Sequence, residues 1–66
     1  MTEYRVFIQA VRESAGEDGP RREERMITYT VPAESPEQAT AAARARFELE
    51  HGGSGWAAEG LGLLSL

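Results

Sequence analysis

The sequence has no cysteine, which removes the usual reinforcement of so short a chain. A domain of 66 residues buries only about 60% of the surface that its unfolded form exposes, so its stability is marginal. Small domains compensate with disulfides, a structural metal or a second subunit. Disulfides and cysteine-based zinc sites are excluded, and a single histidine argues against an all-histidine site. We therefore expect one domain with no metal and no cofactor, stabilised by very efficient packing or by association.

Lysine and asparagine are also absent, so arginine is the only strong cation, and the net charge is −4. This acidic balance opposes non-specific attraction to nucleic acid or to an anionic membrane. The arginine-, alanine- and glutamate-rich composition indicates a high-GC genome, bacterial or phage. No apolar run approaches the roughly 18 residues of a membrane span, and no signal segment opens the chain, so we expect a cytoplasmic protein that does not contact membranes.

Two segments have the alternation of β-strands. Residues 2–12 carry apolar side chains on one face and Phe7 and Val11 on the other, which suits the centre of a small sheet. Residues 23–31 place Ile27, Tyr29 and Val31 on one face, and Pro32 ends the strand. Between them, residues 13–22 contain two glycines, a proline and many charges, and we predict a mobile loop whose base extends as a ribbon.

A helix is predicted over residues 36–51. Ser35 is a favourable N-cap, Pro36 suits the first helical position, and Gln38 completes an S-x-x-Q capping box. Gly52 and Gly53 predict a left-handed stop. On the apolar side of this helix, small alanines allow close approach to the sheet, and Phe47 and Leu49 are the expected anchors.

The last segment, residues 57–66, is rich in leucine and glycine, and we predict a third strand of unclear register. The order β-β-α-β predicts an α+β domain with one helix covering one face of three strands. A right-handed crossover allows two arrangements. We favour an antiparallel sheet with the first strand in the centre; placing the third strand beside the second would give a mixed sheet.

The run V-P-A-E-S-P-E-Q-A, residues 31–39, resembles the strand-to-helix junction of small prokaryotic and phage proteins with the order β-β-α-β. The resemblance implies the same fold. It implies no function.

The leading functional prediction concerns the sheet face that the helix leaves open. Apolar side chains there would form an exposed patch that a second copy or another protein would bury. We predict a self-associating, non-enzymatic interaction module that uses either this open face or a sheet edge, by pairing through the second or the third strand, with a dimer as the first expectation. Trp56 allows two interpretations: it is an interface anchor, or it is a core residue that covers the end of the helix. The residues of the predicted interface are Phe7, Val11, Met26, Thr28 and Trp56.

The alternative is a small regulator that contacts nucleic acid through an arginine-bearing hairpin, since two-stranded ribbons enter grooves. Its contact residues would be Arg12, Arg21, Arg22 and Arg25. An enzyme is the third possibility, and His51 is its one candidate general base. No catalytic residue is predicted, because His51 is better explained as a residue that interacts with the helix C-terminal dipole.

Overall fold

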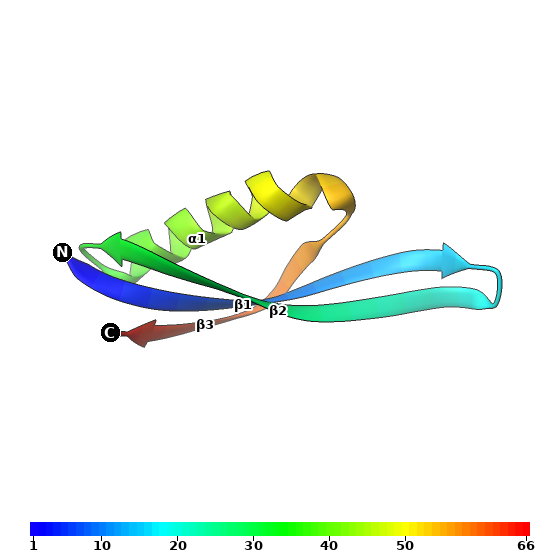
Figure 1. Ribbon diagram of the computed structural model, residues 1–66, viewed down its shortest axis with the longest axis horizontal. Helices are drawn as coiled ribbons and strands as arrows, with labels where there is room; N and C mark the ends of the chain where they lie inside the picture. The colour runs from blue at the N-terminus through cyan, green and yellow to red at the C-terminus, as the bar shows by residue number, and fades with distance from the viewer.

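The computed structural model describes all residues, 1–66, in the order β1 (Thr2–Gly16), β2 (Gly19–Ala33), α1 (Pro36–His51), a short 3-10 turn η1 (Gly52–Ser54) and β3 (Ala57–Ser65). The three strands form one antiparallel sheet in the order β2-β1-β3, and α1 lies across one face (Figure 1). The α+β prediction with the first strand central is therefore confirmed.

β1 and β2 form one continuous hairpin that is much longer than predicted. Its register runs without a break from Thr2 opposite Ala33 to Gly16 opposite Gly19. The predicted loop over residues 13–22 is wrong, because only Glu17 and Asp18 turn the chain. Neither of these two residues has a positive φ, so the reversal relies on Gly19, whose φ is +113°. Glycine adopts this conformation without the steric cost that a Cβ brings.

The sheet is extended well beyond the helix. The molecule measures 49 × 18 × 13 Å and its radius of gyration is 13.7 Å, against roughly 11 Å expected for a compact domain of this length. The excess comes from the turn end of the hairpin, which projects away from α1 and β3 (Figure 1). We call residues 13–22 the distal arm, and the rest of the molecule the body.

The core lies between α1 and the sheet. β1 contributes alternate residues from Tyr4 to Ala10, β2 contributes Tyr29, Val31 and Ala33, and Trp56 closes one end. The helix contributes Ala39, Ala43 and Phe47, which recur every fourth position and so form a narrow stripe. Phe47 is fully buried, as predicted.

Leu49 is not an anchor of the helix, contrary to the prediction. Its side chain is 88% exposed. The buried stripe of α1 is only one residue wide, because the alanines bring the helix close to the sheet and Phe47 fills the space at its end. A residue two positions after Phe47 is turned about 200° around the helix axis and faces away from the sheet.

The sequence predicted the N-terminal end of α1 better than its C-terminal end. Ser35 Oγ accepts the Gln38 N–H at 3.2 Å, so Ser35 caps the helix as expected. The Gln38 side chain departs from the predicted capping box, because its Oε1 accepts the N–H of Glu34, at 3.1 Å, in place of that of Ser35. The left-handed stop at Gly52 and Gly53 does not form. Gly52 is right-handed, the chain adds the turn η1, and the left-handed residue is Gly55, with φ +86°.

Candidate interaction surfaces

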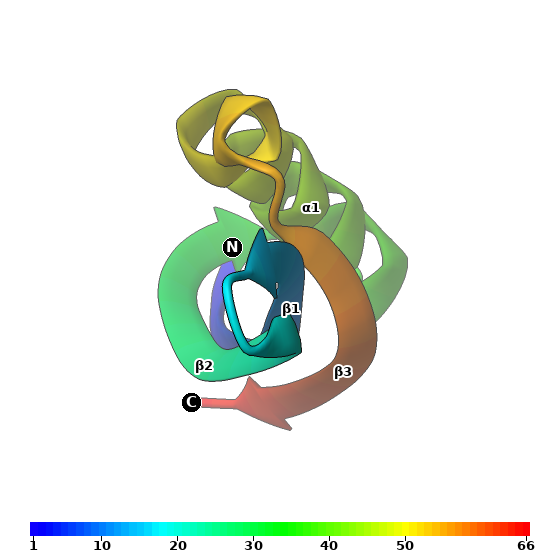
Figure 2. The same ribbon diagram turned by 90° about the vertical axis from the view of Figure 1, so that its right-hand side faces the viewer.

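The open face is the side of the sheet opposite α1 (Figure 2). Phe7 lies opposite Thr28, Gln9 opposite Met26 and Val11 opposite Glu24, so the four predicted interface residues of β1 and β2 share this face. Phe7 and Val11 are half-buried, whereas Met26 and Thr28 are exposed. The structure therefore brings Phe7, Val11, Met26 and Thr28 together.

Two glycines of β3 flatten this face beside Phe7. Gly62 is the cross-strand neighbour of Phe7, and a Cβ built on it would lie 3.8 Å from the Phe7 ring. Gly60 is placed in the same way beside Gln9. An aromatic ring beside a cross-strand glycine compensates for the missing side chain of that glycine. The open face therefore continues onto β3, where Leu64 is exposed.

Trp56 is not part of the open face. It is 7% exposed and belongs to the core on the helix side, just before β3. The Arg12 guanidinium lies 4.7 Å from the indole centroid, and that of Arg25 lies 5.1 Å from it. Both distances are within the range of a cation–π contact. Of the two interpretations, the structure supports Trp56 as a core residue.

The arginines of the predicted nucleic-acid surface are all engaged within the chain. Arg12 Nη2 donates to both carboxylate oxygens of Glu23, at 3.0 and 2.9 Å, in addition to its contact with Trp56. Arg25 lies over Trp56, and Arg21 is 3.9 Å from the Asp18 carboxylate. These three arginines share the helix side of the hairpin, whereas Arg22 lies on the open face.

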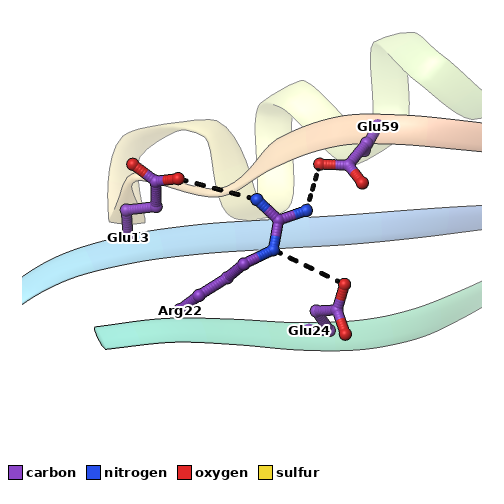
Figure 3. A network of polar contacts seen from close by, with 4 residues as sticks. All are labelled: Glu13, Arg22, Glu24 and Glu59. Atoms are coloured by element: carbon purple, nitrogen blue, oxygen red, sulfur yellow. Dashed lines mark hydrogen bonds and ion pairs between the residues drawn. The ribbon is translucent and has the colours of Figure 1, made fainter. Parts of the chain in front are cut away.

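Arg22 is surrounded by three carboxylates. It hydrogen-bonds to Glu59 of β3 and lies 3.6 Å from both Glu13 and Glu24 (Figure 3). The hydrogen bond with Glu59, together with the negative charge of that side chain, raises the pKa of Arg22. Glu59 occupies the irregularity in β3, since Gln9 pairs with Gly60 and Ala10 with Ala58. The bulge therefore turns the one charge of β3 inward over the sheet.

A second polar cluster joins the end of α1 to β2. The Tyr29 hydroxyl donates to Glu50 Oε1 at 2.9 Å, and Arg46 Nε donates to Glu50 Oε2 at 3.3 Å. Burial, followed by the bond to Glu50, raises the pKa of Tyr29 to about 12. The bond from Tyr29, supported by that from Arg46, lowers the pKa of Glu50. His51 Nε2 lies 3.9 Å from the same carboxylate. This cluster fastens the helix to the sheet.

Of the exposed residues, the leucines of β3 are those whose position the sequence predicted least well. Leu61 and Leu63 pair with Ile8 and Val6 on the helix side, yet both remain partly exposed because α1 lies mainly over β1 and β2. Leu64 and Leu66 are exposed as well. The repeated leucine was visible in the sequence, and Gly60 and Gly62 indicated that a bulge was possible. The face of each leucine depends on where the bulge lies, at Glu59, and no local signal gave that position.

Comparisons with protein-family models, with curated proteins and with solved structures find no match for this chain. The structure contains no detectable pocket, and no group of three or more His, Cys, Asp or Glu side chains is placed to hold a metal ion. None of its helices is long and apolar enough to cross a membrane.

Proposed function

We propose that this protein is a non-enzymatic assembly module that associates with copies of itself through the apolar surface of its sheet. One observation supports the proposal: of the seven large apolar side chains that are exposed, five belong to the sheet or its end. They are Met26, Leu61, Leu63, Leu64 and Leu66. A cytoplasmic location is part of the proposal.

The energetics favour covering these side chains. Complete burial of a leucine or methionine stabilises a protein by about 1.5–3 kcal/mol, and these residues have roughly half of that still to gain. The total accessible surface is 4511 Å², against about 4,100 Å² expected for a folded monomer of this mass. For a 66-residue domain whose core has few large residues, the additional burial is a substantial part of the total stability.

The alternative of nucleic-acid binding has weaker support. The distal arm has the shape of a groove-binding ribbon, but the four arginines in it and at its base are paired with carboxylates or with Trp56. Each phosphate contact would have to displace one of these partners, with Glu17 and Asp18 at the tip opposing the approach. A fluorescence-anisotropy titration with duplex and single-stranded DNA at low salt tests this; salt-dependent binding there would favour the alternative.

The experiment for the proposed function is sedimentation velocity over a concentration series up to several hundred micromolar. We expect a mass above the 7.2 kDa of one chain. The double variant Met26→Gln/Leu64→Gln should weaken association without changing the net charge, because it removes apolar surface only. Leu49→Gln is the control, since Leu49 is also apolar and even more exposed but lies on the helix. A monomer at every concentration contradicts the proposal.

A further inference from the structure

The two edges of the sheet differ in how they are protected against pairing with another strand. The outer edge of β2 carries Pro20, Pro32 and the charged run Arg21–Arg25, and charges and prolines are the usual devices that prevent edge pairing. The outer edge of β3 has neither over Gly60–Leu66, and the side chain of Glu59 is held over the sheet by Arg22. We call residues 60–66 the β3 edge.

One hydrogen bond fixes which backbone groups of the β3 edge are free. The Leu66 N–H donates to the Glu3 carbonyl at 2.9 Å, which makes Glu3 and Leu66 a hydrogen-bonded antiparallel pair. Such pairs alternate with non-bonded ones, so Leu64 and Gly62 also direct their backbone groups toward β1. The residues between them direct theirs to the free edge. They are Leu61, Leu63 and Ser65.

The side chains of the β3 edge alternate in a complementary way. On the open face the sequence places two glycines, Gly60 and Gly62, and then two leucines, Leu64 and Leu66. The four leucines of this edge are 43%, 37%, 50% and 53% exposed, in chain order. If β3 of a second copy is placed antiparallel beside this strand, the two glycines of each copy lie opposite the two open-face leucines of the other.

We propose that two copies pair antiparallel along their β3 edges, with the two-fold axis beside Leu63, and form one continuous six-stranded sheet. This inference rests on the proposed function and names its contact. In this register Leu64 lies opposite Gly62 of the second copy, and Leu66 lies opposite Gly60. Each exposed leucine of the open face then packs over a glycine.

The hydrogen-bonding pattern excludes registers that are shifted by one residue from the Leu63-centred one. Only every second residue directs its N–H and C=O to the free edge. A one-residue shift would therefore place each of these residues opposite a residue whose N–H and C=O point back toward its own β1, and no hydrogen bonds would form. A shift of two residues in one direction places Leu64 against Leu64 of the second copy and shortens the ladder. A shift of two in the other direction places Gly62 against Gly62 and draws the bulge at Glu59 into the ladder. The Leu63-centred register avoids both faults.

The symmetry of this pairing fixes where the other elements of the second copy lie. The two-fold axis is perpendicular to the sheet, so both α1 helices lie on the same face. Leu61 and Leu63 of each copy then form one apolar strip between the two helices. The distal arms point in opposite directions, because the two-fold rotation reverses every direction within the plane of the sheet and each arm projects from one end of its own copy (Figure 1). No charged side chain enters the contact.

Single-cysteine variants test the register directly, because the chain has no other cysteine. Leu63→Cys should form a covalent dimer on mild oxidation, since facing residues of a hydrogen-bonded pair are about 5.5 Å apart at Cα, within disulfide range. Leu61→Cys alone should not, because its two copies lie about four residues, roughly 13 Å, apart along the ladder. Mixing Leu61→Cys with Ser65→Cys should restore cross-linking. Leu49→Cys, exposed on the helix, is the control.

The outcomes separate this inference from the proposed function. If sedimentation finds an oligomer but Leu63→Cys cross-links no faster than Leu49→Cys, β3 pairing is wrong and association uses the open face or another surface. If the wild-type chain is a monomer at all concentrations, both proposals are wrong. Far-UV circular dichroism of each variant verifies folding. Should Leu63→Cys fail to fold, the mixed pair of Leu61→Cys and Ser65→Cys decides the register alone.

Discussion

The two halves of the β1–β2 hairpin share one unbroken register but differ in what stabilises them. In the body, cross-strand neighbours such as Val6 and Tyr29 are buried under α1. In the distal arm no residue is buried, and the cross-strand neighbours at its base carry opposite charges, as in Glu13 and Arg22. The same backbone ladder is thus supported by apolar burial at one end and by exposed ion pairs at the other.

The difference shows that regular secondary structure need not mean equal stability. An isolated two-stranded ribbon is marginally stable in water, and exposed ion pairs contribute little. The distal arm therefore depends on the body, which fixes the register that the arm continues. We expect amide exchange in the arm by local opening at low free energy, and exchange in the body only through global unfolding.

The largest expected effect comes from breaking the body. Phe47→Ala removes the largest fully buried side chain and should cost about 3–5 kcal/mol, enough to abolish a cooperative transition in a domain of this size. Thermal unfolding followed by circular dichroism measures this. Leu49→Ala is the matched control and should change stability by less than about 0.5 kcal/mol. An unchanged melting curve for Phe47→Ala would show that the body is not held by this core.

A smaller effect should come from the turn of the arm. Gly19→Ala places a Cβ on a residue with φ +113° but brings that Cβ within 4 Å of no other atom, so the cost is one of backbone conformation alone, about 1–3 kcal/mol. Amide exchange should accelerate in residues 13–22 and remain unchanged in the body. Gly53→Ala is the control, since it is equally open and has no positive φ. Equal acceleration across the chain would mean that arm and body unfold together.

The cluster of Tyr29 and Glu50 should make the stability of the protein depend on pH in both the alkaline and the acidic range. Because the pKa of Tyr29 is raised from 10 to about 12, folding is stabilised by the protonated hydroxyl below pH 10, and this stabilisation is lost between pH 10 and 12. The lowered pKa of Glu50 gives stability that is present above its ordinary pKa and lost as the pH falls. Tyr29→Phe should cost about 1 kcal/mol and reduce both losses. Urea unfolding across pH measures this.

Tyr4→Phe is the control for this experiment, because the Tyr4 hydroxyl forms no hydrogen bond within the chain and the residue is buried to a similar degree. NMR titration of the Glu50 carboxyl gives an independent readout. Its pKa should rise in Tyr29→Phe and stay constant in Tyr4→Phe. If both variants leave that pKa unchanged, the bond between Tyr29 and Glu50 does not form in solution.

The smallest effect concerns the ion pairs of the arm. Arg22→Gln removes the contacts with Glu13, Glu24 and Glu59, and because all four side chains are exposed, the loss of stability should be slight and should vanish at high salt. Amide exchange in the arm at low and high salt measures it. Arg44→Gln on the helix removes the same charge without an ion pair and should leave the arm unchanged. A loss that persists at high salt would mean packing, rather than charge, holds Arg22.

Sequence alone determined the features that depend on neighbours along the chain. The start of α1 followed from Ser35, Pro36 and Gln38, and the inner faces of β1 and β2 followed from strict alternation. The central position of β1 followed from apolar residues on both of its faces, as Phe7 and Val11 show. These signals are local because capping and strand alternation each act within a few residues.

Tertiary structure decided what depends on pairing between distant residues. The paired arm could not be predicted, because the opposite charges of Glu13 and Arg22 stabilise it only once the register is known. Trp56 is buried because η1 delivers it between Arg12 and Arg25. The faces of the β3 leucines follow from a bulge at Glu59. Each is a contact between residues far apart in sequence, so no local preference specifies it.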